Sequence, residues 1–65
     1  MLDKKKIRGL REAKGESLAE MASQVGMSES HLGQTELGTR IPNAHALKAI
    51  ADYLGVKTDD LFELP

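Results

Sequence analysis

The sequence predicts an all-α fold, a compact five-helix domain, and three observations lead to this prediction. Apolar residues recur three and four positions apart, a short polar side chain that can cap a helix opens each segment, and glycine closes most of them. With 65 residues, 40% of them hydrophobic, the chain can bury one modest core. We therefore expect a single domain over residues 1–65, held together by packing because the chain has no cysteine.

The first two segments have clear boundaries. Asp3 is placed to cap a helix over residues 4–14 that ends at a glycine. Ser17 opens a second helix as Ser-Leu-Ala-Glu, the reciprocal capping pattern in which the side chain of Glu20 reaches back to the cap, and Gly26 ends this helix. The apolar face of the first helix is expected to contain Ile7, Leu10 and Ala13.

The remaining segments follow the same pattern. Ser28 begins a third helix that runs to Leu37, and Asn43, after the turn at Pro42, caps a fourth. The fourth helix is expected to bury Ala44, Leu47, Ile50, Ala51 and Leu54. Thr58 is expected to cap a last short helix with the apolar residues Leu61, Phe62 and Leu64. Three apolar residues exceed what a short tail needs, so we expect part of this face to form a contact between two copies of the chain.

The distribution of charge is more informative than the net charge of −1. Five of the nine basic residues fall in the first eleven positions and acidic residues gather near the end, so only one end of the chain can face phosphate. The start is charged and no apolar run reaches about eighteen residues, so we expect neither a secretory signal nor a membrane span, and a cytoplasmic protein. No nucleophile and base pair, metal-ligand cluster or phosphate loop can be assembled, which predicts no enzyme, cofactor, metal or small-molecule substrate.

Residues 17–38 have the spacing of a helix-turn-helix. Gly26 supplies the left-handed turn between the second and third helices, and the small side chain of Ala22 lets these helices cross closely. The angle between them is expected to be held from inside by Met21, Val25, Met27 and Leu32. In such a pair the second helix has its amino-terminal half free to enter a DNA major groove.

With these residues in place, the chain resembles the phage repressor and Cro type of helix-turn-helix domain over residues 7–62. The motifs are LREAKG before the second helix, ASQVGMS across the turn, LGVKTDDLF near the end, and GMSESHLG, which is similar to the amino-terminal domain of phage lambda repressor. Each motif alone is common in helical proteins, but the spaced set is specific. The resemblance implies sequence-specific binding of double-stranded DNA in transcriptional control. A single copy that reads one half-site would bind weakly, so we expect a homodimer whose recognition helices lie one DNA turn apart.

The resemblance also implies roles for individual residues. The base-contacting positions of the family fall on Glu29, Ser30 and Gln34, with His31 beside them. In these positions Gln34 would pair with adenine and Glu29 would accept a hydrogen bond from a cytosine amino group. Phosphates would be met by Ser28 with the free amides of the helix start, and by Arg40 and Asn43.

A structural ion pair is implied in the same way. In this family an arginine late in the first helix often pairs with an acid late in the third, and Arg11 and Glu36 occupy these positions. We expect a largely buried pair that fixes the recognition helix.

Several positions depart from the pattern of the family. Leu18 replaces a glutamine that contacts a phosphate, Leu37 replaces a polar or basic residue, and Thr35 lies where a large apolar residue normally packs. Glu29 would face a polyanion. Gly33 weakens its helix by roughly 1 kcal/mol relative to alanine, which is tolerable where a side chain would strike DNA or another helix.

Plainer interpretations of these residues also fit the sequence. Glu29 suits a helix start through the helix dipole alone, His31 and His45 suit solvated helix faces, and Lys4 to Lys6 suit a solvated helix start as well as a phosphate-binding arm. The alternative function is a protein-interaction module on the same scaffold, with weak or no DNA binding. In that case Leu18 and Leu37 would form an apolar docking patch.

Overall fold

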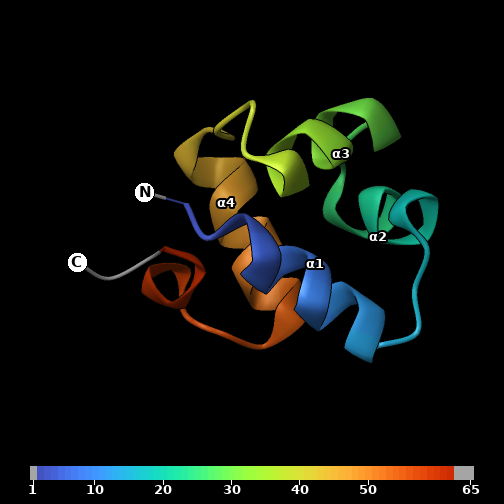
Figure 1. Cartoon of the computed structure of the whole chain (residues 1–65), viewed down its shortest axis with the longest axis horizontal. Helices are drawn as coiled ribbons and strands as arrows, with labels where there is room; N and C mark the ends of the chain where they lie inside the picture. Colours follow the sequence, from blue (N-terminus) through green and yellow to red (C-terminus); the bar gives the residue numbers. More distant parts are fainter. Residues whose placement is uncertain (1, 63–65) are drawn as a thin grey trace.

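The computed structural model describes residues 2–62 (Figure 1). Its elements are α1 (Lys4–Ala13), α2 (Leu18–Val25), α3 (Glu29–Leu37), α4 (Ala44–Leu54) and the 3-10 helix η1 (Thr58–Leu61). Within residues 2–62 no strand forms, and one isolated antiparallel bridge joins Leu2 to Phe62. None of the helices in this part of the chain has the length and apolar run that crossing a bilayer requires.

The four α-helices begin at the side-chain caps that the sequence predicts. Asp3 accepts hydrogen bonds from two amides of the first turn of α1. Ser17 caps α2, Ser28 caps α3 and Asn43 caps α4, and each accepts from the amide three residues later, at 3.1, 3.0 and 2.8 Å. These bonds satisfy amides that have no partner inside their own helix, so the caps fix where each helix starts.

The expected fifth helix is not an α-helix but a single 3-10 turn, and Thr58 does not cap it. The cap position is Lys57, whose backbone amide donates to the carboxylate of Asp60 at 3.1 Å. The amide of Asp3 donates to the carbonyl of Leu61 at 2.8 Å, and Phe62 is extended where it bridges to Leu2. Because the chain must become extended to meet the first residues, the helix cannot continue.

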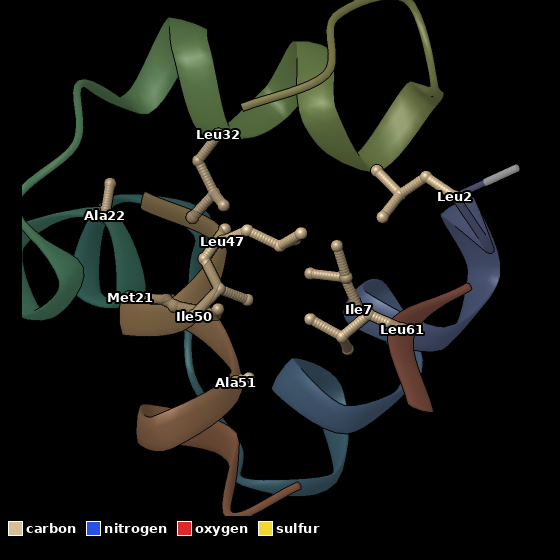
Figure 2. Close-up of a cluster of buried hydrophobic side chains, with 9 residues drawn as sticks. All are labelled: Leu2, Ile7, Met21, Ala22, Leu32, Leu47, Ile50, Ala51 and Leu61. Carbon is tan, nitrogen blue, oxygen red and sulfur yellow. The ribbon is translucent and has the colours of Figure 1, made fainter. Parts of the chain in front are cut away.

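The core lies where α1, α2, α3, α4 and η1 meet, and Figure 2 shows its side chains converging between these elements. It consists of Leu2, Ile7, Met21, Ala22, Leu32, Leu47, Ile50, Ala51 and Leu61. The buried core therefore begins at Leu2, before Ile7, where the resemblance to the repressor and Cro type begins. Burial of these apolar side chains is the main force that holds a domain of this size together.

Three expectations about apolar side chains were wrong. Ala13 and Ala44, placed on inner faces by their spacing, are exposed because they lie at helix ends, beyond the packed turns. Leu61 is fully buried in the core of its own chain, so it is not available for the expected contact between two copies. Phe62 is half-buried against the same core, and Leu64 lies outside the described residues.

A polar contact joins the α1–α2 connection to α4. The hydroxyl of Tyr53 donates to the carboxylate of Glu16, and the ammonium group of Lys14 lies 4.8 Å from the centre of the Tyr53 ring. The hydrogen bond to Glu16, then burial and the negative charge of Glu16, raise the pKa of Tyr53 to about 12. The turn before α2 is therefore fastened to the end of α4 as well as by its own backbone bonds.

The conformation at Gly26 predicts a contrast between two glycine substitutions. Gly26 has φ 73°, whereas Gly9 lies inside α1, and a Cβ at either position meets nothing within 4 Å. Gly26→Ala should lower the free energy of unfolding by about 1 kcal/mol, because a side chain disfavours the left-handed conformation. Gly9→Ala should raise it by about 0.5–1 kcal/mol, because alanine favours a helix interior. Urea denaturation measures both changes in the free energy of unfolding. Changes of the same sign in the two variants would contradict the left-handed conformation at Gly26.

The contact between Glu16 and Tyr53 predicts an alkaline titration. Tyr53 is the one tyrosine in the chain and there is no tryptophan, so tyrosinate absorbance reports this group alone. In the folded protein it should titrate near 12, and in Glu16→Gln closer to the ordinary value of about 10. The folded-state pKa is raised, so the stabilisation is complete below about 10 and is lost as the pH rises through 12. Glu12→Gln is the control and should leave the titration unchanged.

Candidate nucleic-acid interface

Local hydrogen bonds fix both ends of α2, and a glycine turn leads from α2 into α3. The amide of Ser17 donates to the carboxylate of Glu20 at 2.8 Å, and the Ser17 hydroxyl accepts from the amide of Glu20. The bond from the Ser17 amide is the main cause that lowers the pKa of Glu20. Gly26 then adopts φ 73°, and the amide of Met27 donates to the carbonyl of Ala22 at 2.9 Å. These bonds close α2 and aim the chain into α3, as the sequence predicts.

The inner and outer sides of α3 differ in chemistry. Leu32, Thr35 and Glu36 are buried, whereas Ser30, Gln34 and Leu37 are exposed. The exposed residues are spaced four and three positions apart, so they form one stripe along the outer side of α3. In Figure 1, α3 lies along one edge of the molecule beside α2. The predicted base-contacting residues Ser30 and Gln34 therefore lie on the outer stripe, and Glu29 is exposed at the start of the helix.

Thr35 explains one departure from the family pattern. Its side chain is fully buried, and its hydroxyl donates to the carbonyl of His31 at 3.0 Å. The hydroxyl is satisfied within its own helix, so threonine fills a core position without leaving an unpaired polar group.

His31 differs from its predicted neighbours. The residue is half-buried, and its Nε2 atom is buried with no hydrogen-bond partner in the described part of the chain. The expectation of a solvated histidine was wrong for this nitrogen. His45, in contrast, is exposed at the start of α4.

The residues predicted to meet phosphate lie at the two ends of α3 or beyond it. Ser28 is exposed, and its hydroxyl accepts from the amide of His31, so its side chain already caps the helix. Arg40 and Asn43 are exposed on either side of Pro42, whose side chain is buried and anchors this turn. The Oδ1 atom of Asn43 accepts from Ala46, which leaves the amide nitrogen of the side chain free to donate.

A bidentate ion pair joins α1 to α3. The Nε of Arg11 donates to one oxygen of Glu36 at 2.7 Å, and a terminal nitrogen donates to the other at 3.0 Å. The side chains are only 12% and 7% exposed. A third bond from Arg11 reaches the carbonyl of Glu16 at 2.8 Å, and the hydrogen bond to Glu36 is the main cause that raises the pKa of Arg11. The pair expected from the resemblance is thus formed, with good geometry and added backbone support.

A groove runs beside the outer stripe of α3. Its volume is about 270 Å³, and it is lined by Arg8, Arg11, Leu18, Gly33, Glu36 and Leu37. A Cβ atom at Gly33 would lie 3.3 Å from a methyl carbon of Leu18, so the glycine allows α2 to approach α3 closely. A side chain at Gly33 would therefore strike α2, one of the two obstacles, DNA or another helix, that the sequence suggested. Both leucines stand out in the sequence, but the groove arises only when the helices are brought together.

The surface has little positive charge. The residues of α3 include Glu29 and no lysine or arginine, and Arg40 is the next basic residue along the chain. At the groove, Arg11 is paired with Glu36, and the other cation is Arg8. Attraction of a polyanion to this surface is therefore weak.

This helical arrangement and its central turn define a helix-turn-helix domain. Residues 6–64 match the helix-turn-helix domain family, and the chain belongs to it. The chain is similar to a protein of Bacillus subtilis (strain 168) called the uncharacterized HTH-type transcriptional regulator YazB. The two are 37% identical over 57 residues, which cover 88% of this chain and 83% of that protein.

The buried ion pair predicts a large loss of stability on truncation. Arg11→Ala leaves the buried carboxylate of Glu36 without its partner, and should lower the free energy of unfolding by roughly 3–5 kcal/mol in chemical denaturation. Arg8→Ala is the matched control, because its pair with Glu12 is exposed and should contribute less than about 1 kcal/mol. A denaturation curve of Arg11→Ala that coincides with that of the parent would refute a structural role for the pair.

Proposed function

We propose that this chain binds double-stranded DNA sequence-specifically as a transcriptional regulator, with the amino-terminal half of α3 in the major groove. The observation that carries the proposal is the outer stripe of α3, where the hydrogen-bonding side chains of Ser30 and Gln34 are exposed. Membership of the helix-turn-helix family and the similarity to a protein called a transcriptional regulator support it. The docking mode is that of the phage repressor and Cro type.

The residues predicted to contact DNA have different roles in this proposal. Gln34 pairs with adenine, and Glu29 accepts a hydrogen bond from a cytosine amino group. Ser30 serves as a second hydrogen-bonding group at the base edges, and His31 lies beside it with its Nε2 turned away from solvent. Phosphates are met by Ser28 with the free amides of the α3 start, by Arg40, and by the side-chain amide of Asn43.

We infer that two copies of the chain bind two half-sites. A single α3 with few cations contacts few base pairs, so a lone copy would bind weakly. Since Leu61 is buried within its own chain, the contact between copies does not use its side chain. The number of chains bound to one duplex, measured by native mass spectrometry, tests this inference.

The sequence specificity predicts different effects for two substitutions. After selection of a site from randomised DNA, Gln34→Ala should reduce the preference at one base pair by about 1–3 kcal/mol. Arg40→Ala should weaken binding to all sequences alike, and should make the slope of log affinity against log salt shallower by about 1. Fluorescence anisotropy over a salt series measures both.

The same titrations separate DNA binding from the alternative. Affinity for a random duplex pool must fall as salt rises if phosphates are contacted. Undetectable binding at low salt would contradict the proposal and favour a protein-interaction module. A Gln34→Ala variant with unchanged base preference would contradict the role of Gln34 alone.

A further inference from the structure

We propose that the groove beside α3 binds an acidic segment of another protein that carries a large apolar side chain, and that this segment and DNA exclude each other. The groove is the one lined by Arg8, Arg11, Leu18, Gly33, Glu36 and Leu37. The exclusion of DNA rests on the proposed function, whereas the binding of the protein segment stands without it.

The walls of the groove favour an apolar occupant. Leu18 on α2 and Leu37 on α3 line it, Leu37 is 65% exposed, and Gly33 lines the same groove without a side chain. The volume of about 270 Å³ lies just below the range of about 300–1,000 Å³ that is typical of small-molecule sites. The groove therefore suits a side chain of a protein partner better than a cofactor, and its burial would remove both leucines from water.

The charged residues at the groove favour an acidic occupant. Glu36 does not oppose one, because both its oxygens accept hydrogen bonds from Arg11 at 2.7 and 3.0 Å. The ion pair of Arg8 with Glu12 is exposed and contributes little, so the guanidinium of Arg8 can turn to a carboxylate of the partner. The sequence of α1, KKKIRGLREA, contains five basic residues and one acidic residue, so the field of this helix also attracts carboxylates.

A phosphate group fits the groove less well than such a segment. Phosphate oxygens bind hydrogen-bond donors and cations, and the side chains of the two leucines supply neither. In the repressor and Cro type a glutamine that contacts a phosphate stands where this chain has Leu18, so the leucine removes a donor and adds an apolar wall. A protein segment offers apolar surface and a carboxylate together, which matches both the leucines and Arg8.

The place of the groove makes the segment and DNA compete. Leu37 follows Gln34 by three residues on the outer stripe of α3, and Leu18 is the first residue of α2, where the proposed docking mode puts a phosphate. A segment that covers Leu37 therefore occupies space that α3 needs when it enters the major groove. The segment lowers the affinity of the chain for DNA, and DNA lowers the affinity for the segment by the same factor.

The test uses synthetic peptides of known sequence. A phage-displayed library of random peptides is selected on the parent chain, and the enriched sequences are synthesised with a fluorescent label. We expect these peptides to share a large apolar residue close to Asp or Glu. At a peptide concentration about ten times its Kd, the apparent Kd for a duplex selected from randomised DNA should rise about tenfold, as competition for one surface requires.

Two variants and their matched controls locate the peptide. Leu37→Ala should weaken peptide binding about tenfold, because it removes one apolar wall. Ile41→Ala removes a side chain of similar exposure, 69%, outside the groove and should leave peptide binding unchanged. Arg8→Ala should weaken peptide binding about threefold at low salt, and less as salt rises. Lys48→Ala breaks a similarly exposed pair, with Asp52 on α4, and should leave peptide binding unchanged.

The outcomes separate this inference from the proposed function, once circular dichroism shows that the variants fold. Failure to enrich any peptide, or peptide binding that Leu37→Ala does not weaken, would overturn the groove as a protein site. If Leu37→Ala weakens duplex binding while no peptide binds, the occupant is DNA, and the inference is overturned. The same holds if no peptide binds and Leu37→Ala converts a dimer to a monomer in analytical ultracentrifugation, because the occupant is then a second copy.

Simultaneous binding of peptide and duplex to one molecule would overturn the exclusion. Absence of binding to any duplex would instead overturn the proposed function, and the peptide measurements alone would then decide whether the groove is a docking site.

Discussion

The ion pair between Arg11 and Glu36 is the constraint on which the orientation of α3 depends. Only three residues of α3 are buried, and Leu32 is the single large apolar side chain among them. A helix with so little apolar surface is not oriented by packing alone. The bidentate contact to α1 fixes its rotation, and the third bond of Arg11, to the carbonyl of Glu16, extends this anchor to the start of α2.

The two sides of α3 therefore have different roles. The inner side uses one leucine, one threonine that bonds within its own helix, and one paired carboxylate. The residues on the outer side do not hold the fold together, so they can vary without unfolding the domain. The inner side alone sets the orientation of α3. An outer side with few cations therefore leaves the position of the helix unchanged.

Helix starts and the central turn could be predicted from the sequence because their causes are local. Ser17, Ser28 and Asn43 each cap a helix by accepting from an amide three residues later. Gly26 has a left-handed backbone conformation, which glycine adopts more readily than other residues. The pair of Arg11 and Glu36 is 25 positions apart in the chain, and only the resemblance to a family suggested it. The contact of Glu16 with Tyr53 had no such guide and was missed.

The errors likewise have a common physical origin. The end of the chain was expected to be helical because Leu61, Phe62 and Leu64 are apolar, but pairing of Phe62 with Leu2 requires extended backbone, and helical periodicity carries no information about it. The exposed positions of Ser30 and Gln34 follow from the helix pattern, as predicted. The groove and the buried Nε2 of His31 depend on how neighbouring elements approach α3, which no local pattern specifies.

The bridge between Leu2 and Phe62 has an architectural consequence. It brings the two ends of the described chain together, on the side of the molecule away from the amino-terminal half of α3 (Figure 1). A protein fused at either end would therefore lie away from the surface that α2 and α3 share. The same proximity makes the fold suitable for circular permutation, since a short linker can join the old ends and a new opening can be made in an exposed turn.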